Sequence, residues 1–330
     1  MAKGISSASQ MSRYGAIARQ LPFTFGKVFF VGNTNDSWFA DNILNTFPND
    51  GDGNTRVFSL LSLAYAACVS GRNDVIIVDA NSSISEPAGI AWTKSRINVI
   101  GVGQNRFTDN AAKISIDNTD STGYVLKVTG TRNSFTNIKF IQNSTNAAAL
   151  SVLQTGGEGN VYRNCSFIFA NTTNLGGTTA NEVICGEDSG TFEDCEFGAD
   201  TLLTTAARTV FLVKQVTSGQ QMKSCRVRRC TFKISSSSSS AVLLSVNSTS
   251  DVLFTNLFED CTFYASVDAS GGVIITNAVQ SIGSLTAGTL GFVRAAALFC
   301  THFCNTLSAN VQAVNGAANA TTGGVGATPS

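Results

Sequence analysis

The chain has 330 residues, of which 43% are hydrophobic and 13% are charged, about half the usual charged fraction. Its 22 basic and 22 acidic residues cancel, which argues against a nucleic-acid-binding domain with a basic surface. No run of 18 apolar residues and no apolar signal-like run near Met1 is present, which argues against a membrane span and a secretory signal. We therefore expect a protein made in the cytoplasm that binds neither nucleic acid nor membrane.

Residues 1–27 are predicted to form an N-terminal arm. The segment is small and polar at residues 4–10, and it sustains neither a helical nor a strand period afterwards. Two interpretations stay open, a disordered terminus and an arm that orders against a neighbouring subunit. In the second interpretation the contact residues are Arg13, Tyr14, Arg19, Leu21, Phe23 and Phe25.

Residues 28–94 are predicted to hold a strand and a capping helix that lead into a solenoid. Apolar residues at helical spacing predict the helix over 56–70, with Thr55 or Ser59 as its N-cap and Gly71 as its stop. A helix here would close the first end of a solenoid, which otherwise exposes a core layer and unpaired strand edges.

The turn-rich segment before this helix contains a weak metal-site pattern. Asp50, Asp52 and Asn54 have the spacing of the start of a calcium loop. Leu61 stands at the twelfth position, where such a loop needs a glutamate. We expect no calcium site here.

A six-residue phrase, apolar-x-x-(Cys/Ile)-x-(Phe/Val), recurs through residues 95–282. Its copies begin at Ile97, Phe135, Tyr162, Phe192, Val227 and Phe258. Successive copies end 27 to 38 residues apart, and a phrase repeated at such a period is typical of a solenoid. Each copy follows a separate short β-rich run with turn residues between, and no helical pattern intervenes. We therefore interpret residues 95–282 as β-strand coils.

The spacing inside the phrase predicts which side chains face inward. The Cys or Ile and the final Phe are two residues apart, so they share a strand face. The first residue lies three before the Cys, so a bend must intervene. Short polar residues that suit a bend stand there in four copies, Asn137, Asn164, Asp194 and Asp260, and Val99 and Arg229 stand there in the other two.

The phrase thus predicts an inward structural ladder. Its members are Cys165, Cys195, Cys230, Cys261, Phe140, Phe167, Phe197, Phe232 and Phe263. Stacked cysteines would run parallel, a poor geometry for a disulfide, and free thiols are typical of a reducing compartment. Glu193 and Glu196 are predicted to point to solvent.

Residues 283–330 are predicted to be a C-terminal closing segment followed by a charge-poor tail. The apolar stretch 292–304 would close the second end of the solenoid. Cys300, His302 and Cys304 are three potential zinc ligands, but no fourth ligand is apparent and their spacing is not that of a finger. We favour core packing for these residues.

One acidic group is the best catalytic candidate in the sequence. It comprises Glu187, Asp188, Glu193, Asp194 and Glu196. Two carboxylates about 5 to 9 Å apart can hydrolyse a glycosidic bond, and Asp188 with Glu193 is the pair that a turn would bring to that distance. A solvated turn explains the group more simply, since Asp194 occupies the bend position of the repeat.

Two other patterns are also interpreted as structural. The basic run 226–229 is interpreted as a solvated coil face. Gly101 and Gly103 are interpreted as a turn, and because no helix follows them they do not form a nucleotide-binding loop. We therefore predict no catalytic, cofactor or metal site.

The capping helix, the strand at 75–78 and coils carrying Asn/Asp-Cys-x-Phe together resemble right-handed parallel β-helix proteins of the pectin-lyase-like group. The segments 27–32, 55–58 and 97–103 resemble β-helix proteins encoded among the virion structural genes of tailed bacteriophages. The resemblance implies an all-β fold, a single-stranded right-handed parallel β-helix with an N-terminal capping helix.

The same resemblance implies a non-enzymatic virion protein. In this interpretation it is a capsid decoration or cement subunit on the capsid surface, attached through its N-terminal arm to the major capsid protein or to neighbouring virion subunits. This interpretation also includes a homotrimer. Separately, a net charge near zero favours association over a lone monomer. The alternative is a tailspike or receptor-binding protein that binds or cleaves bacterial surface polysaccharide. A bacterial adhesin is disfavoured because the sequence shows no secretion signal.

Overall fold

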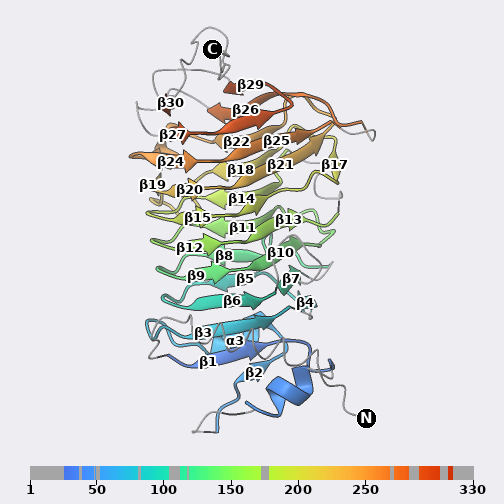
Figure 1. Ribbon diagram of the computed structural model, residues 1–330, viewed down its shortest axis with the longest axis vertical. Coiled ribbons are helices and arrows are strands. Elements are labelled where there is room, and N and C mark those ends of the chain that lie inside the picture. The colour runs from blue at the N-terminus through green and yellow to red at the C-terminus, as the bar shows by residue number, and fades with distance from the viewer. Residues whose placement is uncertain are drawn as a thin grey trace.

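The computed structural model describes residues 26–36, 39–47, 49, 53–80, 83–103, 112–116, 119–171, 178–267, 271–281, 290–304 and 311–314. The predicted arm contacts between Arg13 and Phe25 lie outside the described residues, as do Asp50 and Asp52 of the calcium-like segment. The described chain winds into a rod in which each coil lies on the one before it (Figure 1).

The strands stack in parallel into three long sheets (Figure 1). Sheet 1 runs in the order β2 (Val57–Phe58), β1 (Val28–Val31), β3 (Val75–Asp79), β6 (Asn98–Val102), β9 (Ser134–Thr136), β12 (Val161–Arg163), β15 (Thr191–Glu193), β20 (Arg226–Arg228), β24 (Asn256–Glu259), β27 (Leu290–Val293) and β30 (Val311–Val314). Sheet 2 runs from β4 (Ser83–Glu86) through β7 (Ala112–Ile116), β10 (Ile138–Gln142), β13 (Ser166–Phe169), β16 (Glu196–Phe197), β21 (Thr231–Ser236) and β25 (Thr262–Ser266) to β28 (Ala296–Leu298). Sheet 3 runs from β5 (Ile90–Trp92) through β8 (Leu126–Val128), β11 (Ser151–Thr155), β14 (Asn181–Cys185), β18 (Thr209–Val213), β22 (Val242–Val246) and β26 (Ile275–Ser281) to β29 (Cys300–Cys304).

Shorter elements lie at the corners of the rod. They are β17 (Leu203–Thr204), which pairs with β21, the pair of β19 (Met222–Lys223) and β23 (Val252–Leu253), and the 3-10 turn η3 (Thr249–Asp251). The predicted fold class, a right-handed parallel β-helix, is confirmed by this topology.

Left-handed backbone bends connect sheet 1 to sheet 2. Asn137, Asn164, Asp194 and Asp260 all have φ between 50° and 59°, the region that asparagine and aspartate tolerate better than most residues. Arg229 adopts the same conformation with φ 50°, where strain costs an arginine about 1–2 kcal/mol. The predicted bend position of the phrase is therefore correct in these five copies.

The first copy of the phrase was placed wrongly. Val99 pairs in register with Phe135, so it is an inward strand residue and not a bend. The chain continues through β6 without turning, and Gly101 passes under Asn137, whose Nδ2 donates to the Gly101 carbonyl at 2.9 Å. The inward positions of sheet 2 in this coil are taken later by Ala112 and Ile114, which pair beside Ile138 and Phe140.

The inward ladder is continuous. Its four cysteines and five phenylalanines are at most 1% exposed. The rings of Phe140, Phe167, Phe197, Phe232 and Phe263 follow one another with centroids 4.5 to 5.8 Å apart. The described cysteines are free thiols. Such stacks fix the alignment of neighbouring coils, because each ring packs closely only against the equivalent ring of the next coil.

The cysteines also contact backbone groups at the bends. The Cys165 thiol lies 3.3 Å from the carbonyl of Arg163, and the Cys230 thiol lies 3.2 Å from that of Arg228. Each of these carbonyls belongs to the residue just before a bend. Each already accepts from a backbone N–H of the preceding coil, Arg163 from Asn137 at 2.9 Å and Arg228 from Asp194 at 3.0 Å. The thiol is therefore a second, weak donor to the carbonyl, a contact that an aliphatic side chain of similar size cannot make.

The capping helix is shorter than the sequence predicts. It spans α3 (Leu61–Ala67), because Val57 and Phe58 form β2 and pair with β1. Neither Thr55 nor Ser59 caps it, since Leu60 is the N-cap residue and no side chain there accepts a hydrogen bond. Instead Glu86 of β4 accepts from the backbone N–H groups of Leu61, at 2.6 Å, and Ser62, at 3.3 Å.

Both ends of α3 are thus held by the first complete coil. At the C-terminal end Lys94 Nζ donates to the carbonyls of Tyr65, Ala66 and Cys68 at 2.7 to 2.9 Å, where a cation also complements the helix dipole. The Tyr65 ring stacks on Trp92 with centroids 4.1 Å apart. The helix therefore seals the N-terminal end of the core.

A second, smaller apolar layer lies on the outer side of sheet 1 at this end. Phe30 and Ile77 pack there against Phe39 and Ile43. The π-helix η1 (Ala40–Leu44) carries Ile43 over the sheet. Strands β1 and β3 are consequently buried on both faces, which explains the continuous apolar run at 75–78.

Glu86→Ala tests the long-range cap. The change removes the acceptor of two helix N–H groups that have no intrahelical partner, so we expect the free energy of unfolding to fall by about 1–2 kcal/mol. The neighbouring exposed Ser85 provides the control, and Ser85→Ala should have no measurable effect. Glu86→Gln keeps an acceptor oxygen and should lose less than Glu86→Ala. If Glu86→Ala and Ser85→Ala unfold at the same denaturant concentration, the cap does not stabilise the rod.

Candidate functional site

The five acidic residues between 187 and 196 do not form one site. Glu187 points into the core, and Asp188 lies at the outer turn before β15. Glu193 and Asp194 lie on an outer charged face, and Glu196 points outward from sheet 2. Residues that are close in the sequence are therefore distributed over different surfaces of one coil.

Glu187 is the centre of a buried polar network. It is fully buried, accepts from Asn160 Nδ2 at 2.8 Å, and is hydrogen-bonded to the Thr155 hydroxyl. Thr155 Oγ1 in turn lies 2.8 Å from the Tyr162 hydroxyl. Gly190 leaves the room for this carboxyl, because a Cβ there would lie 2.2 Å from Glu187 Cγ. The predicted solvated turn is thus wrong for Glu187.

Burial raises the pKa of Glu187 to about 7, although its hydrogen bonds with Thr155 and Asn160 oppose the shift. Such a pKa is typical of a general acid, but the carboxyl is fully buried inside the core. We interpret it as a structural group.

A column of asparagines continues the same network. Asn133 donates from its backbone N and its Nδ2 to Asn160 Oδ1, at 2.9 and 3.1 Å. Asn256 occupies the equivalent place further along, where its Oδ1 accepts from the Cys225 backbone N–H at 3.0 Å. Sequence analysis missed this column, yet a signal exists: each of these asparagines stands two residues before the first residue of a phrase copy.

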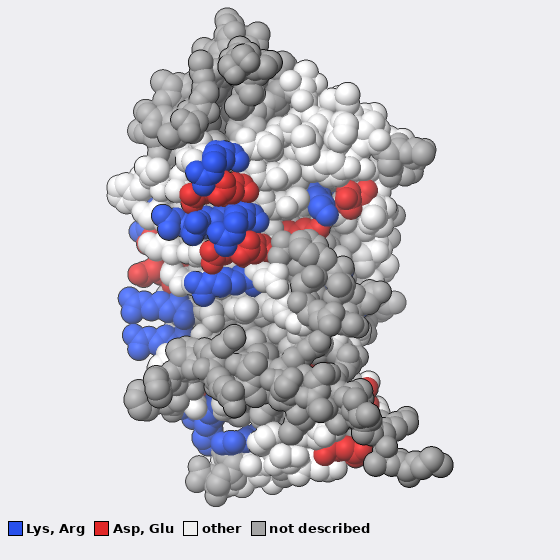
Figure 2. All heavy atoms as spheres, viewed as in Figure 1, with Lys and Arg blue, Asp and Glu red and all other residues white. Residues whose placement is uncertain are grey.

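The outer face of the bends carries charged rows of alternating sign (Figure 2). In coil order the rows are Arg163, then Glu193 with Asp194, then Arg228 with Arg229, then Glu259 with Asp260, then Arg294. Representative contacts are Arg163–Glu193 at 3.0 Å, Arg229–Asp194 at 2.8 Å and Arg228–Glu259 at 2.9 Å. One exposed pair contributes only about 0.2–1 kcal/mol, but here every row bridges two coils.

Glu193 and Glu196, the two carboxylates predicted to point to solvent, are both paired with basic side chains. Hydrogen bonds from Arg229 and Arg163 lower the pKa of Glu193, which keeps this carboxyl ionised. Glu196 faces outward as predicted, but it is almost covered by Lys233, whose Nζ lies 2.7 Å from its Oε1. The basic run 226–229 is a solvated coil face as predicted, with Val227 pointing inward.

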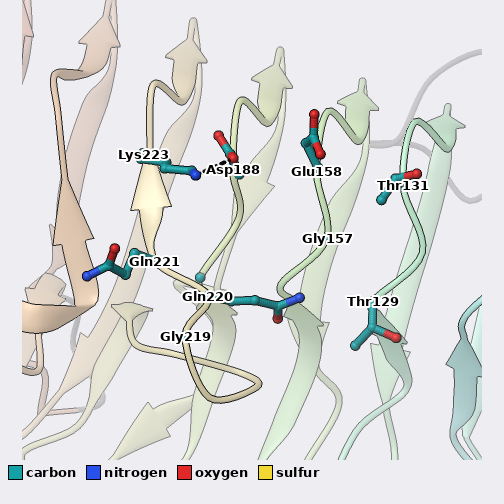
Figure 3. Close-up of a pocket in the computed structure, with 10 residues that line it drawn as sticks. Thr129, Thr131, Gly157, Glu158, Asp188, Gly219, Gln220, Gln221 and Lys223 are labelled. Atoms are coloured by element: carbon teal, nitrogen blue, oxygen red, sulfur yellow. Dashed lines mark ion pairs between the residues drawn. The ribbon is translucent and has the colours of Figure 1, made fainter.

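A surface hollow of about 230 Å³ crosses four coils at the turn between sheets 3 and 1 (Figure 3). It is lined by Thr129, Thr131, Gly157, Glu158, Gly186, Asp188, Gly219, Gln220, Gln221 and Lys223. Gln220 reaches back over the preceding coils, and Gly156 permits this because a Cβ there would lie 2.3 Å from Gln220 Oε1.

Charged groups line one wall of the hollow. Glu158, Asp188 and Lys223 follow one another in register on successive coils. Lys223 Nζ lies 2.7 Å from Asp188 Oδ2, and Figure 3 shows these two side chains directed at each other. Glu158 is exposed and forms no ion pair with another described residue. The wall thus presents an ion pair beside an ionisable carboxyl.

Most of the metal candidates lie outside the description: Asp50 and Asp52 are not described, and neither are the side chains of His302 and Cys304. No three His, Cys, Asp or Glu side chains among these residues are arranged to hold a metal ion. Cys300, His302 and Cys304 follow one another in β29, and the side chains of His302 and Cys304 lie outside the description. The described helices include none that is long and apolar enough to cross a membrane.

The point at which the chain enters the rod is tightly fixed. Asp74 is fully buried and accepts from the backbone N–H of Lys27 at 2.8 Å and of Val69 at 2.7 Å, and from Arg72 Nε at 2.6 Å. Gly26 passes so close that a Cβ would lie 2.4 Å from the Asn73 carbonyl oxygen. Residues 1–25 are therefore joined to the rod at a rigid position beside its N-terminal end.

Comparisons with known proteins give only distant structural similarity. No protein-family model and no curated protein matches the chain. Among solved structures, pectate lyase Pel9A has 14% identity and a TM-score of 0.47 over 88% of this chain and 78% of its own. Pectin methylesterase PemA from Erwinia chrysanthemi has 12% identity and a TM-score of 0.46 over 83% and 79%.

A viral protein is similar to the same degree. ORF18 of Geobacillus virus E2 has 12% identity and a TM-score of 0.49, over 76% of this chain and 51% of the viral chain. The chain thus spans about half the length of that protein. At these identities and TM-scores the similarities assign no activity, and the fold itself rests on the strand register described above.

The raised pKa of Glu187 predicts a pH dependence of stability. Between about pH 4.5 and 7 the folded rod keeps a proton that the unfolded chain releases. The free energy of unfolding should therefore fall as the pH rises through this window, by an amount on the order of 3 kcal/mol, and level off above it.

Glu187→Gln keeps the shape of the protonated carboxyl and should remove this part of the pH dependence, as measured by unfolding at pH 4.5 and pH 8. Glu158→Gln changes an exposed carboxyl of the neighbouring coil and should leave the wild-type slope. A wild-type slope in Glu187→Gln would contradict the assignment.

Proposed function

We propose that this chain is a non-enzymatic structural protein of a tailed-phage particle, a capsid decoration or cement subunit whose β-helix is a stiff rod. The observation that carries the proposal is the fixed entry at Gly26 and Lys27, which tethers twenty-five residues to one end of the rod. In this proposal the tethered segment attaches the rod to the major capsid protein or to neighbouring virion subunits on the capsid surface.

The segments whose sequence resembles virion proteins gather at that same end. Residues 27–32, 55–58 and 97–103 contribute β1, β2 and β6, which lie in one sheet with β3 between β1 and β6. They build the capped end from which the arm departs, so the resemblance and the tether concern one surface. This coincidence supports attachment through the N-terminal end.

The settings of the acidic residues support a non-catalytic protein. Glu187 is hydrogen-bonded within the buried core network, and Glu193 and Asp194 form ion pairs with Arg229. Asp188 is paired with Lys223. A glycosidase needs one carboxyl that is protonated beside the substrate and a second that is free to act as base or nucleophile, and these residues serve stability in the described structure.

Deleting residues 1–25 tests the attachment. The shortened chain should keep the β-sheet circular dichroism of the rod, because the deletion ends before Gly26 and leaves the described contacts of Gly26 and Lys27 in place. It should no longer co-sediment with capsids. A triple variant, Leu21→Ser with Phe23→Ser and Phe25→Ser, should weaken binding by about a hundredfold or more, since each buried apolar side chain contributes about 1.5–3 kcal/mol.

The matched control changes three residues of the same arm, Ser6→Ala with Ser7→Ala and Ser9→Ala, and should bind normally. Full co-sedimentation of the shortened chain would refute attachment through the arm.

The proposed homotrimer is tested by light scattering of the purified protein, which measures the molar mass in solution. A molar mass equal to that of one chain at all concentrations would refute the trimer.

The hollow of Figure 3 favours a second candidate function. Its threonines, glutamines and the Glu158 carboxyl offer donors and acceptors over a floor of glycine backbone, which suits a hydroxyl-rich ligand such as a polysaccharide segment. In this alternative the protein is a tailspike or receptor-binding protein, and the hollow is its binding site.

A glycan-binding and cleavage assay separates the two functions. If the protein is a decoration subunit, the wild type neither retains nor cleaves surface polysaccharide of the host. If it is a receptor-binding protein, Asp188→Asn and Glu158→Gln should each reduce retention about tenfold, the effect of losing a hydrogen bond to a charged group. Glu193→Gln lies on the charged rows outside the hollow and serves as the control. Loss of a measurable cleavage activity in Asp188→Asn or Glu158→Gln, with the activity of Glu193→Gln unchanged, would favour an enzyme over both binding roles.

A further inference from the structure

A second ladder of left-handed bends runs along the rod at the corner between sheets 3 and 1. Its residues have φ between 53° and 66°, and in coil order they are Arg96, Arg132, Gly159, Ser189, Ser224 and Phe254. From Arg132 to Ser224, each bend directly follows a member of the row that Figure 3 shows along the hollow, Thr131, Glu158, Asp188 and Lys223. Leu253, just before Phe254, pairs in register with Lys223 and continues the row. The hollow therefore lies beside this ladder.

The middle of the ladder carries small residues. Gly159, Ser189 and Ser224 stand on the coils that line the hollow, whereas the exposed and bulky side chains of Arg132 and Phe254 stand on the coils before and after them. Coils repeat at about 4.8 Å, so the stretch from Arg132 to Phe254 is about 19 Å long. We call this stretch, together with the hollow beside it, the corner strip. Its length suits an elongated ligand that lies parallel to the rod axis.

Phe254 is a feature of the corner strip that the fold does not require. Its side chain is 61% exposed, and it belongs neither to the described hydrophobic core nor to the side chains packed against that core. A left-handed backbone is unfavourable for a phenylalanine, and Gly159 shows that the same ladder accepts a glycine. Strained residues of this kind occur mainly at binding and active sites.

Several polar groups of the corner strip lack partners within the described chain. Arg132 and Glu158 are exposed, and neither forms an ion pair with another described residue. The amide oxygen of Gln220, which lines the hollow, is buried without a hydrogen-bond partner. A buried oxygen without a donor is unfavourable, and a ligand hydroxyl in the hollow would supply one. Donors and acceptors are therefore available here, unlike on the charged rows.

The chemistry of the strip favours a saccharide over other chain-like ligands. The backbone N–H groups of Arg132, Gly159 and Ser189 donate to carbonyls of the next coil at 2.7 to 2.8 Å, so an added peptide strand would find no free edge. The carboxylates of Glu158 and Asp188 disfavour nucleic acid. A sugar offers hydroxyl groups to the polar hollow and an apolar C–H face to the electron-rich ring of an aromatic residue.

We propose that Phe254 is the stacking platform of a saccharide-binding site that extends along the corner strip. One sugar ring lies on the Phe254 ring, and the chain continues over the hollow toward Arg132. The inference rests on the second candidate function and deepens it, because it names a residue that positions the ligand and the direction in which the ligand runs. It is compatible with attachment through the N-terminal end, since the corner strip lies along the side of the rod.

Replacing Phe254 tests the platform. We would apply the full chain to an array of immobilised bacterial surface polysaccharides and measure the dissociation constant for the polysaccharide that retains the wild type best. Phe254→Ala should raise this constant about tenfold or more, because the stacking contact is lost. Phe254→Trp keeps an aromatic face and should bind at least as tightly as the wild type.

Phe299→Ala is the matched control. Phe299 also has a left-handed backbone, with φ 57°, and is 53% exposed, but it lies between β28 and β29 at a different corner. Its removal should leave the dissociation constant unchanged, and equal losses in Phe254→Ala and Phe299→Ala would overturn the proposal.

Asp188→Asn separates the platform from the second candidate function. If Asp188→Asn weakens binding and Phe254→Ala does not, the hollow binds a saccharide and the platform is wrong. If no polysaccharide on the array retains the wild type, both the platform and the second candidate function are wrong.

Phe254→Asn distinguishes a binding role from a structural one. Asparagine tolerates the left-handed backbone, so this variant should unfold at a higher denaturant concentration than the wild type while binding as weakly as Phe254→Ala. A gain in stability with a loss of binding is the pattern expected of a residue that serves a ligand. Normal binding by Phe254→Asn, or unfolding at a lower denaturant concentration, would show that Phe254 serves the fold and would overturn the proposal.

Discussion

The structure depends on one constraint, the in-register stacking of parallel coils. Each coil must present the same kind of side chain at the same place as its neighbour, so that phenylalanines stack on phenylalanines and cysteines stand at successive bends. The bend between sheets 1 and 2 is left-handed in the successive coils from Asn137 to Arg294. Asparagine and aspartate meet this requirement at little cost, whereas Arg229 meets it with strain that its ion pairs to Asp194 and Glu193 offset.

The fold was predictable because the residues that meet this constraint recur at fixed positions in the repeated phrase. The predictions that were wrong concern features that depend on contacts between distant residues. Glu86 caps a helix twenty-five residues before it, and no local pattern around Thr55 or Ser59 can report that. Val99 matched the phrase by spacing alone, but Gly101 lets Asn137 cross above it, and pairing with Phe135 sets the true register. Apolar spacing therefore identifies the coils, while their alignment is decided by pairing between them.

The candidate site was harder to predict because neighbours in a strand point in opposite directions. Glu187, Asp188 and Glu193 were grouped by sequence, yet the structure gives them a core network, an outer hollow and a charged row. The decisive residue for Glu187 is Gly190, whose missing side chain opens the space for the carboxyl. The asparagine column was visible as a residue two places before the phrase, whereas the hollow depends on Gln220 crossing back over earlier coils, which no pattern of spacing reveals.

The charged rows show how the same constraint limits where function can reside. Arginines and carboxylates alternate from coil to coil, so each charge on this face is matched by its own neighbours and the face has little unbalanced charge to offer a partner. The core ladder and the Glu187 network are equally committed to holding coils together. Among the described surfaces, the hollow is less committed to this role: Glu158 stands there beside the ion pair of Asp188 and Lys223. The N-terminal end is sealed by α3, whereas in the described part of the chain no helix lies over the last strands β28 and β29, so the two ends of the rod differ.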